Sequence, residues 1–385
     1  MKIFHTSDWH IGRSFYTHST LDALKTVLAA LVQEVCERRI DVVIVAGDVF
    51  DSAMPSAEAF TVLSGALRDI LNAGSKIVMT SGNHDSATRL GFQSEWAGLA
   101  GIHIITGHDG YVPPVTIEDE FGPVRFYGIP YLEPSLVRHH YPDVELRTHE
   151  QVLNHAMDIV REDSAVHGGR SVAISHCFVA DVTAESTDVE RDITAGGINL
   201  VSASVFDGPD YVALGHIHGR SAVSERVRYS GAPLHYSFGE AGKLRGGWIV
   251  ELDVSGLSSV EWLDLPVPRA LSVITGDLAA LLDDPAYDGV GDNWVSAILT
   301  DQVRPMDAMR RLQARFPNAV KLEHRPTLVA GTDDSTYADR VRAKSEPEII
   351  AGFLEHVRNG VGPSGPELAL LRDVTQQLTN AEASA

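Results

Sequence analysis

Several short segments of this 385-residue sequence carry aspartate, asparagine and histidine in patterns that could bind metal ions. Asp8 and His10 stand two positions apart, as do His216 and His218, so in extended backbone both members of each pair project from one face. Similar side chains follow apolar runs elsewhere in the chain. The candidate ligands are Asp8, His10, Asp48, Asn83, His176, His216 and His218.

This ligand set is larger than one ion normally requires, and it suits two ions that share a carboxylate. Two divalent cations about 3.5–4 Å apart act together in displacement at phosphorus, because they lower the pKa of a bound water and stabilise charge on the oxygens. The mixture of imidazole, carboxylate and amide favours Mn²⁺, with iron or zinc as alternatives, over the all-oxygen sites of Mg²⁺ and Ca²⁺. The predicted chemistry is therefore phosphoester hydrolysis with two divalent cations.

Each motif alone also has a structural explanation, because Asp, Asn and His after a strand are common turn and cap residues. Coincidence explains the whole set poorly, since five separate strand candidates end in such side chains. Gly47, Gly82 and Gly215 precede three of these segments, where a strand must turn sharply and the backbone must approach the site. The recurrence of the pattern favours a functional explanation over a purely structural one.

The elements that must position these residues alternate between strands and helices as far as Pro266. The strand candidates are Lys2–Thr6, Asp41–Ala46, Lys76–Thr80, Val124–Ile129, Ser171–Ser175, Tyr211–Leu214, Val227–Ser230 and Trp248–Val254, and the helix candidates are Leu21–Arg38 and Ser56–Ala73. This order predicts an α/β fold with a largely buried sheet, or two sheets sandwiched between helices. In such folds ligands bind beyond the carboxyl ends of the strands, where the candidate ligands lie.

Beyond Pro266 the pattern restarts as a smaller strand, helix, strand, helix, strand set, which we expect to be an α+β domain. A polar linker follows, and apolar residues at helical spacing from Ile349 to Val357 and from Leu371 to Leu378 predict a helix-loop-helix tail. The expected boundaries are residues 1–266, 267–330, 331–345 and 346–385.

The net charge of −21, from 31 basic and 52 acidic residues, disfavours loose binding to a polyanion such as DNA. Between Asp301 and Arg325, however, six basic residues stand against three acidic ones. Arg310, Arg311 and Arg315 in this stretch are candidate phosphate contacts, although a solvated helix face is the commoner reason for such a pattern.

Two widely separated cysteines, Cys36 and Cys177, support neither a disulfide framework nor a cysteine-based zinc site. We find no pattern of a secretory signal and no apolar stretch near the roughly 20 residues of a membrane-spanning helix. We therefore expect a cytoplasmic protein without a membrane partner.

The blocks D-x-H, G-D-x-x-D, G-N-H-D, a strand-end His and G-H-x-H resemble the signature of the calcineurin-like metallophosphoesterases, over about Met1 to Asp253. The segments S-D-W-H-I-G-R-S-F and Y-S-G-A-P-L-H-Y-S-F-G-E further resemble the SbcD branch of the double-strand-break nucleases. This resemblance implies a β-sandwich flanked by helices, a small domain that caps DNA, and a tail that binds an SbcC-type ABC ATPase with a coiled coil.

The resemblance also implies how the ligands are shared between the ions. The first ion would be held by Asp8, His10, Asp48 and His218. The second would share Asp48 and be held otherwise by Asn83, His176 and His216.

His84 would then remain for catalysis, because the matching histidine of the family stabilises or protonates the leaving oxygen. We expect Asp85 to orient the ring of His84, and Asp51 to support a ligand from behind. His235 stands where an apolar residue is expected, and we interpret it as structural.

The implied activity is Mn²⁺-dependent exonuclease and structure-specific endonuclease cleavage at double-stranded DNA ends and hairpins. It would serve DNA repair, recombination and replication at the nucleoid, in a homodimer within a heterotetramer. Ser56–Ala73 and Thr88–Ala100 would form the dimer interface or pack in the core, and the tail would bind the ATPase or pack back on the body. Two alternatives stay open: an enzyme for a small phosphodiester or phosphoprotein, which the acidic charge favours, and a non-catalytic scaffold, which the complete ligand set opposes.

Overall fold

The computed structural model describes residues 1–179, 200–327, 344–358 and 360–382. The chain divides into two compact units, Met1–Arg269 and Ala270–Ala385. Most of the linker expected at 331–345 lies outside the described residues.

Unit 1 contains two six-stranded sheets, with strand orders β16-β15-β1-β4-β5-β6 and β13-β14-β12-β9-β8-β7. The first consists of β1 (Lys2–Thr6), β4 (Val42–Ala46), β5 (Lys76–Thr80), β6 (Ile102–Ile105), β15 (Gly246–Asp253) and β16 (Gly256–Asp264). The second consists of β7 (Val115–Asp119), β8 (Gly122–Ile129), β9 (Arg170–His176), β12 (Tyr211–Gly215), β13 (Ser221–Ala222) and β14 (Val227–Tyr229). In each sheet the central strands are parallel, so their carboxyl ends lie along one edge of that sheet.

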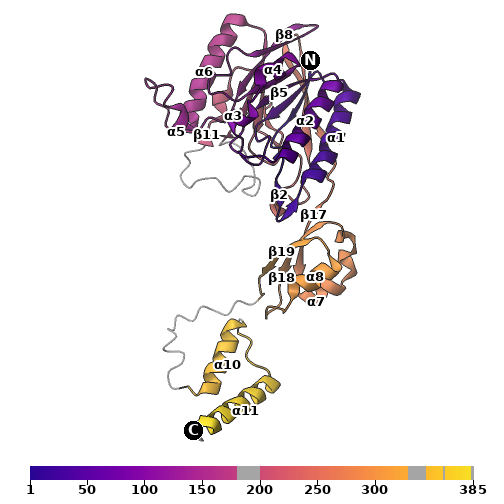
Figure 1. Cartoon of the computed structure of the whole chain (residues 1–385), viewed down its shortest axis with the longest axis vertical. Helices are drawn as coiled ribbons and strands as arrows, with labels where there is room; N and C mark the ends of the chain where they lie inside the picture. The colour runs from indigo at the N-terminus through magenta and orange to yellow at the C-terminus, as the bar shows by residue number, and fades with distance from the viewer. Residues whose placement is uncertain (180–199, 328–343, 359, 383–385) are drawn as a thin grey trace. The chain divides into compact units, whose positions relative to one another are not determined.

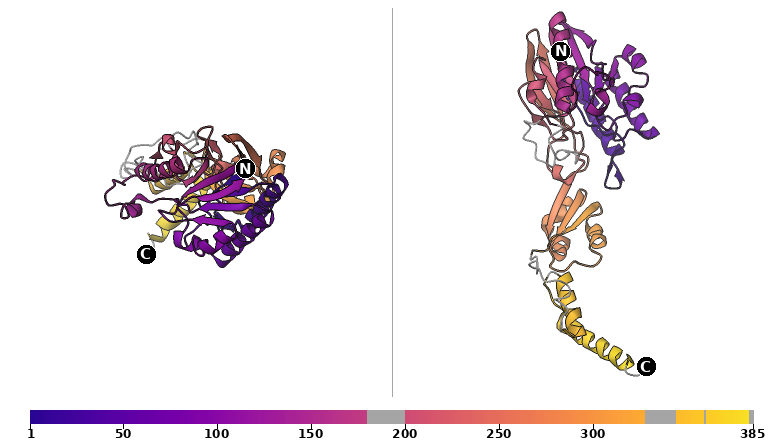
Figure 2. Two further views of the ribbon diagram at one scale, coloured as in Figure 1. Left: turned by 90° about the horizontal axis from the view of Figure 1, so that it is seen from above. Right: turned by 90° about the vertical axis from the view of Figure 1, so that its left-hand side faces the viewer.

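Helices cover the outer face of each sheet, which gives four layers (Figures 1 and 2). The first sheet packs against α1 (Leu21–Arg38) and α2 (Ala57–Asn72), and the second packs against α6 (His149–His167). The short helices are α3 (Ala87–Leu90), α4 (Ser94–Leu99) and α5 (Pro134–Val137). The Ser56 side chain accepts a hydrogen bond from Ala59 N to cap α2, and a Thr148–Gln151 capping box starts α6.

The two sheets face each other across a core of alternate strand residues. On β4, Val42, Ile44 and Ala46 belong to the cluster between the sheets, whereas Val43 and Val45 belong to the cluster beneath α1 and α2. Because both faces of such strands are buried, the sequence shows them as continuous apolar runs. The predicted α/β sandwich is confirmed, and each predicted strand of this unit lies within two residues of its observed bounds.

Unit 2 begins with a three-stranded sheet in the order β17-β18-β19. Its elements are β17 (Leu271–Gly276), α7 (Leu278–Asp283), β18 (Trp294–Leu299), α8 (Ala308–Arg315) and β19 (Ala319–His324). All three strands are parallel with a helix between successive strands, so this domain is α/β and not α+β as expected. Leu281, Leu312 and Phe316 are buried beneath its helices.

The tail consists of α10 (Glu346–Val357) and α11 (Gly365–Glu382), as predicted for a helix-loop-helix. A Ser345–Glu348 capping box starts α10, and Arg358 forms an ion pair with Glu367 at 2.8 Å. The described residues of α10 include none that is buried. Among the described helices of the whole chain, none is long and apolar enough to cross a membrane.

Candidate metal centre

The predicted ligands lie together at the carboxyl ends of five parallel strands of unit 1. Asp8 and His10 follow β1, Asp48 follows β4, Asn83 follows β5, His176 ends β9, and His216 and His218 follow β12. Three overlapping groups have ligand atoms within 4.8 Å of one another: Asp8 with His10 and His218, His10 with Asp48 and His84, and Asp8 with Asp48 and His176. Residues 208 positions apart, such as His10 and His218, are thus brought to one place by the packing of two sheets.

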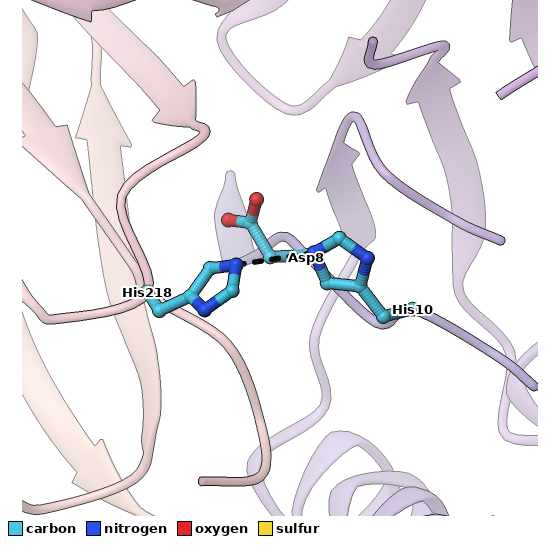
Figure 3. A group of neighbouring side chains, drawn as sticks. All are labelled: Asp8, His10 and His218. Atoms are coloured by element: carbon cyan, nitrogen blue, oxygen red, sulfur yellow. Dashed lines mark hydrogen bonds between the residues drawn. The ribbon is translucent and has the colours of Figure 1, made fainter. Parts of the chain in front are cut away.

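The first group is Asp8, His10 and His218, and all three side chains are buried (Figure 3). The Nε2 atoms of His10 and His218 face each other at 3.1 Å, so the two nitrogens share at most one proton. The Asp8 carboxylate accepts hydrogen bonds from the Ser7 hydroxyl and from His216 N. One carboxylate and two imidazole nitrogens therefore point to a single position.

The other two groups share Asp48, whose Oδ2 lies 3.3 Å from His176 Nε2 and 3.6 Å from His10 Nε2. The Asn83 Oδ1 lies 3.0 Å from His176 Nε2 and 3.2 Å from His216 Nδ1. Asp48 thus contacts His10, which belongs to the first group, and also His176, which does not, and a bridging carboxylate would need such a position.

Several ligands have a positive φ, which for the Asp8–His10 pair and for His216 contradicts the extended conformation expected from the spacing. Asp8 has φ 53°, His10 φ 43°, Asp48 φ 48° and His216 φ 104°. Such conformations are costly for residues with a side chain, and they persist where the surrounding structure imposes them, often at functional sites. The Asp8–His10 pair converges because sharp turns follow β1, and not because of the strand alternation that the sequence suggested.

Residues 1–220 match the model of a family described as calcineurin-like phosphoesterase. The chain belongs to this family. Residues 267–358 match a second model, described as the type 5 capsule protein repressor C-terminal domain, and the two matches together are consistent with an SbcD nuclease subunit.

Three solved structures are similar to this phosphoesterase. A dimetal phosphatase from Danio rerio has 14% identity and a TM-score of 0.39, covering 69% of this chain and 99% of its own. The protein TT1561 of Thermus thermophilus has 12% identity and a TM-score of 0.41, and the match covers 68% of this chain and 98% of that protein. GAP50, the anchor in the inner membrane complex of Plasmodium, has 9% identity and a TM-score of 0.39, and the match covers 85% of this chain and 98% of GAP50.

His84 lies beside the ligands of the phosphoesterase site, with its ring 4.9 Å from that of His10 between centroids. Its Nδ1 is 3.0 Å from the carbonyl oxygen of Asp51, and its backbone N–H donates to Asp48 Oδ1 at 3.0 Å. The Asp51 carboxylate is 3.4 Å from His10 Nδ1. Asp51 therefore lies behind two imidazoles, one through its side chain and one through its backbone.

Asp85 contacts the backbone of two loops, and its expected role in orienting His84 stays a prediction. The two carboxylate oxygens of Asp85 accept hydrogen bonds from the backbone N–H groups of Val49, Phe50 and Gly82, at 2.8 to 3.0 Å. This carboxylate therefore holds the loop after β4 against the loop after β5. Burial, together with the charge of Asp48, raises the pKa of Asp85 to about 6.

Charges in the centre are arranged around Asp48. Burial opposes ionisation of Asp48, but the neighbouring histidines, His176 first, hold its pKa well below the usual range. Burial likewise lowers the pKa of His176, but the Asp48 charge outweighs it and raises that pKa to about 9. Burial lowers the pKa of His10 and raises that of Asp8. An anionic Asp48 is thus stabilised by positive charge, which a bound cation also supplies.

Glycines allow the loops to approach the ligands closely. A Cβ on Gly47, whose φ is 80°, would lie 2.2 Å from His176 Nδ1, and a Cβ on Gly82 would lie 2.1 Å from Asp48 Oδ1. Real Cβ atoms essentially never come this close to other heavy atoms. These two positions admit only glycine unless the ligands move.

The donor set fits two divalent cations. His176 Nδ1 donates to Ala46 O at 3.0 Å, so in the neutral ring the lone pair of Nε2 faces the oxygens of Asn83 and Asp48. Such a convergence of lone pairs is repulsive unless a proton or a cation lies among them. Divalent cations held there would supply Lewis acidity and an activated water for displacement at phosphorus. The protein would hold the cations in position, and it places the His84 imidazole and buried carboxylates beside them.

Three further residues near the centre were missed from the sequence, although they lie within or next to the segments quoted for the family. Arg13 Nη1 lies 3.2 Å from Asp51 Oδ1 and 3.4 Å from His10 Nδ1. Glu240 and Arg245 are buried behind His218. Their signal is a charged residue within or next to a segment quoted for the family, which spacing rules for ligands do not detect.

In unit 2, the three candidate phosphate contacts have different surroundings. The Arg315 guanidinium donates to Leu281 O, Asp284 O and Asp288 Oδ1, so it caps α7, and its role as a phosphate contact stays a prediction. Arg310 pairs with Asp307 at 2.8 Å but stays 81% exposed. Arg311 and Arg315 both line a surface hollow beside α7 and α8.

Proposed function

We propose that this phosphoesterase is a Mn²⁺-dependent DNA nuclease, acting as exonuclease and structure-specific endonuclease at double-strand ends and hairpins. It would act with an SbcC-type ATPase in DNA repair and recombination, in the cytoplasm. The single observation that carries the proposal is the co-occurrence of a buried metal-ligand cluster in residues 1–220 with the SbcD-type C-terminal match in 267–358.

The preference for Mn²⁺ is supported by the ligand chemistry. We assign Asp8, His10, Asp48 and His218 to one ion, and Asp48, Asn83, His176 and His216 to the other. Imidazole-rich sites with carboxylate and amide oxygens suit Mn²⁺ better than Mg²⁺, which prefers oxygen ligands and several waters.

The net charge of −21 opposes binding of this chain to DNA, because both are negatively charged. Divalent cations reduce the negative charge where the phosphate must bind, and Arg310 and Arg311 are candidate contacts to the DNA backbone. We propose residues 1–266 as the nuclease domain and 267–330 as the domain that caps the DNA.

The tail of residues 346–385 is the proposed docking segment for the ATPase. Leu370, Val374 and Leu378 of α11 are 63%, 45% and 57% exposed and recur every four residues, so they form one apolar stripe. An apolar stripe on a helix fits a groove or a coiled coil of a partner.

A homodimer is supported by exposed apolar residues on and beside α4, and by one on α2. Phe92, Trp96 and Leu99 are 72%, 72% and 84% exposed, and Phe60 on α2 is 40% exposed. Large aromatic residues exposed together favour a protein interface over a solvated surface.

The test is cleavage of end-labelled duplex and hairpin DNA by the purified chain, with and without the ATPase, in Mn²⁺ or Mg²⁺. We expect Mn²⁺-dependent cleavage of both substrates, stronger with the ATPase. A chromogenic phosphodiester serves as the reference for intact metal chemistry. Hydrolysis of that reference without any DNA cleavage would indicate a small phosphodiester or phosphoprotein substrate. If a preparation that hydrolyses the chromogenic phosphodiester contained no bound metal, the two-metal assignment itself would be wrong.

A further inference from the structure

Behind the metal centre lies a buried ion pair between Glu240 and Arg245, which are 1% and 2% exposed. Arg245 donates through Nη2 to Glu240 Oε2 and through Nη1 to the backbone carbonyl of His218. The same Oε2 accepts a hydrogen bond from Tyr236 N at 3.1 Å. The other oxygen, Oε1, lies 3.8 Å from His218 Nδ1, a charge contact longer than a hydrogen bond.

Such a pair contributes little to stability by itself. Removing a carboxylate and a guanidinium from water costs several kcal/mol per ion, and apolar replacements of similar volume are often neutral or stabilising. The reason for a buried pair at this position is therefore to be sought in what it contacts. Both of its charged groups contact His218, one at the imidazole and one at the backbone.

Three other imidazoles of the centre show a common pattern, and His216, whose Nδ1 lies 3.2 Å from Asn83 Oδ1, is the exception. The Nδ1 atoms of His84 and His176 each lie 3.0 Å from a backbone carbonyl oxygen, and the Nδ1 of His10 lies 3.4 Å from a carboxylate oxygen of Asp51. An oxygen at Nδ1 keeps the proton there and leaves the Nε2 lone pair for an ion. For His218, the carboxylate near Nδ1 is that of Glu240.

We propose that Glu240, held in place by Arg245, is a positioning residue for His218. It keeps the proton on Nδ1 and directs Nε2 toward the position shared with Asp8 and His10, and so sets the affinity of that half of the centre for a divalent cation. The proposal rests on the metal centre of the proposed function but not on its DNA substrate.

The experiment is calorimetric titration of the full-length chain, freed of metal, with Mn²⁺. We expect Glu240→Gln to weaken binding of one of two ions roughly 10–100-fold, the range for partners behind a metal-bound histidine, while the other ion binds as in the wild type. Circular dichroism and urea unfolding in chelator check the fold. Glu240→Asp, which keeps the charge, should restore part of the affinity.

A double variant, Glu240→Gln with Arg245→Met, separates positioning from stability. Removing both charges should recover the unfolding midpoint lost in Glu240→Gln, but not the Mn²⁺ affinity. Recovery of both would show that the pair is merely structural and would overturn the proposal, as would wild-type binding of both ions by Glu240→Gln.

A matched control is the ion pair of Asp119 and Arg170, whose side chains are 13% and 6% exposed and which contacts none of the metal-centre residues. Asp119→Asn should lower the unfolding midpoint without changing Mn²⁺ affinity. A wild-type chain that binds Mn²⁺ but cleaves no DNA would reject the nuclease proposal and leave this one standing. A wild-type chain that binds no ion would reject the metal centre, and this proposal with it.

Discussion

The Nδ1 of His84 lies 3.0 Å from the backbone carbonyl oxygen of Asp51. Because a carbonyl oxygen only accepts, the neutral ring carries its proton on Nδ1 and its lone pair on Nε2. The His84 backbone N–H donates to Asp48 Oδ1 as well, so both the ring and the chain of His84 are held against the loop after β4. The ring orientation thus depends on main-chain groups that side-chain substitution at Asp51 would not remove.

We predict that His84→Ala lowers kcat for DNA roughly 10²–10⁴-fold, the usual contribution of a general acid or base. Metal content, measured by mass spectrometry after desalting, should stay at the wild-type value. The exposed His167→Ala on α6 is the control. Loss of an ion in His84→Ala would instead make His84 a ligand, which its place beside His10 and Asp48 also permits.

Asp85→Asn should behave differently from His84→Ala. The amide would place N–H groups where a carboxylate oxygen now accepts hydrogen bonds from Val49, Phe50 and Gly82, and an unsatisfied buried donor costs about 1–3 kcal/mol. We expect a lower unfolding free energy and weaker Mn²⁺ binding together. Loss of turnover with unchanged stability and metal affinity would instead support the predicted role of Asp85 in orienting His84.

A methyl group at Gly82 should displace Asp48, the proposed bridging ligand, because the added Cβ would lie 2.1 Å from Asp48 Oδ1. We expect Gly82→Ala to lose Mn²⁺ binding and hydrolysis while far-UV circular dichroism stays unchanged. The control is Gly65→Ala in α2, where a Cβ meets no atom within 4 Å and should stabilise by about 0.5–1 kcal/mol. Wild-type Mn²⁺ binding by Gly82→Ala would contradict the close approach.

Much of unit 1 could be predicted because its central strands are buried on both faces, which makes them plain apolar runs that end in polar side chains. The edge strand β16 was not expected, since residues such as Ser258 and Ser259 break the run where one face meets solvent. The loop geometry was also unpredictable, because the left-handed φ values at Asp8 and His10 accompany backbone hydrogen bonds to Gly47 and Asp48, far along the chain.

Long-range pairing explains the remaining differences. Arg315 belongs to a basic stretch in the sequence, but in the structure it is neutralised by Asp288, 27 positions earlier. Local charge counts do not include such a partner. Glu240 is the opposite case, a residue that no sequence pattern marked and that only the fold brings close to His218.

Folding stability should fall with acid partly through His5, which is fully buried on β1. Its ring contacts the Tyr211 hydroxyl at 2.9 Å and Leu214 O at 3.1 Å, and burial lowers its pKa to about 3 although the carbonyl of Leu214 acts in the opposite direction. The unfolded chain binds this proton below about pH 6.5 and the folded chain does not, so stability is lost as pH falls from about 6.5 toward about 3.

The measurement is urea unfolding in chelator at pH 7 and pH 5, for the wild type and His5→Gln. The variant should be less stable at pH 7, but the wild type should lose about 2 kcal/mol more than the variant between the two pH values. Equal losses would mean that the His5 ring is protonated in the folded state or is not the group that titrates.

The last prediction concerns the apolar stripe of Leu370, Val374 and Leu378 on α11. Replacing all three by serine should abolish co-purification with the ATPase, because the stripe offers the apolar area that a partner helix would bury, at roughly 25 cal/mol per Å². Hydrolysis of a chromogenic phosphodiester should not change, since the metal centre lies in unit 1. The control is serine at Arg372 and Gln376, polar neighbours on the same helix, which should leave the complex intact. If the stripe variant still co-purifies and the control does not, the partner binds the polar face, and the docking surface must be reassigned to it.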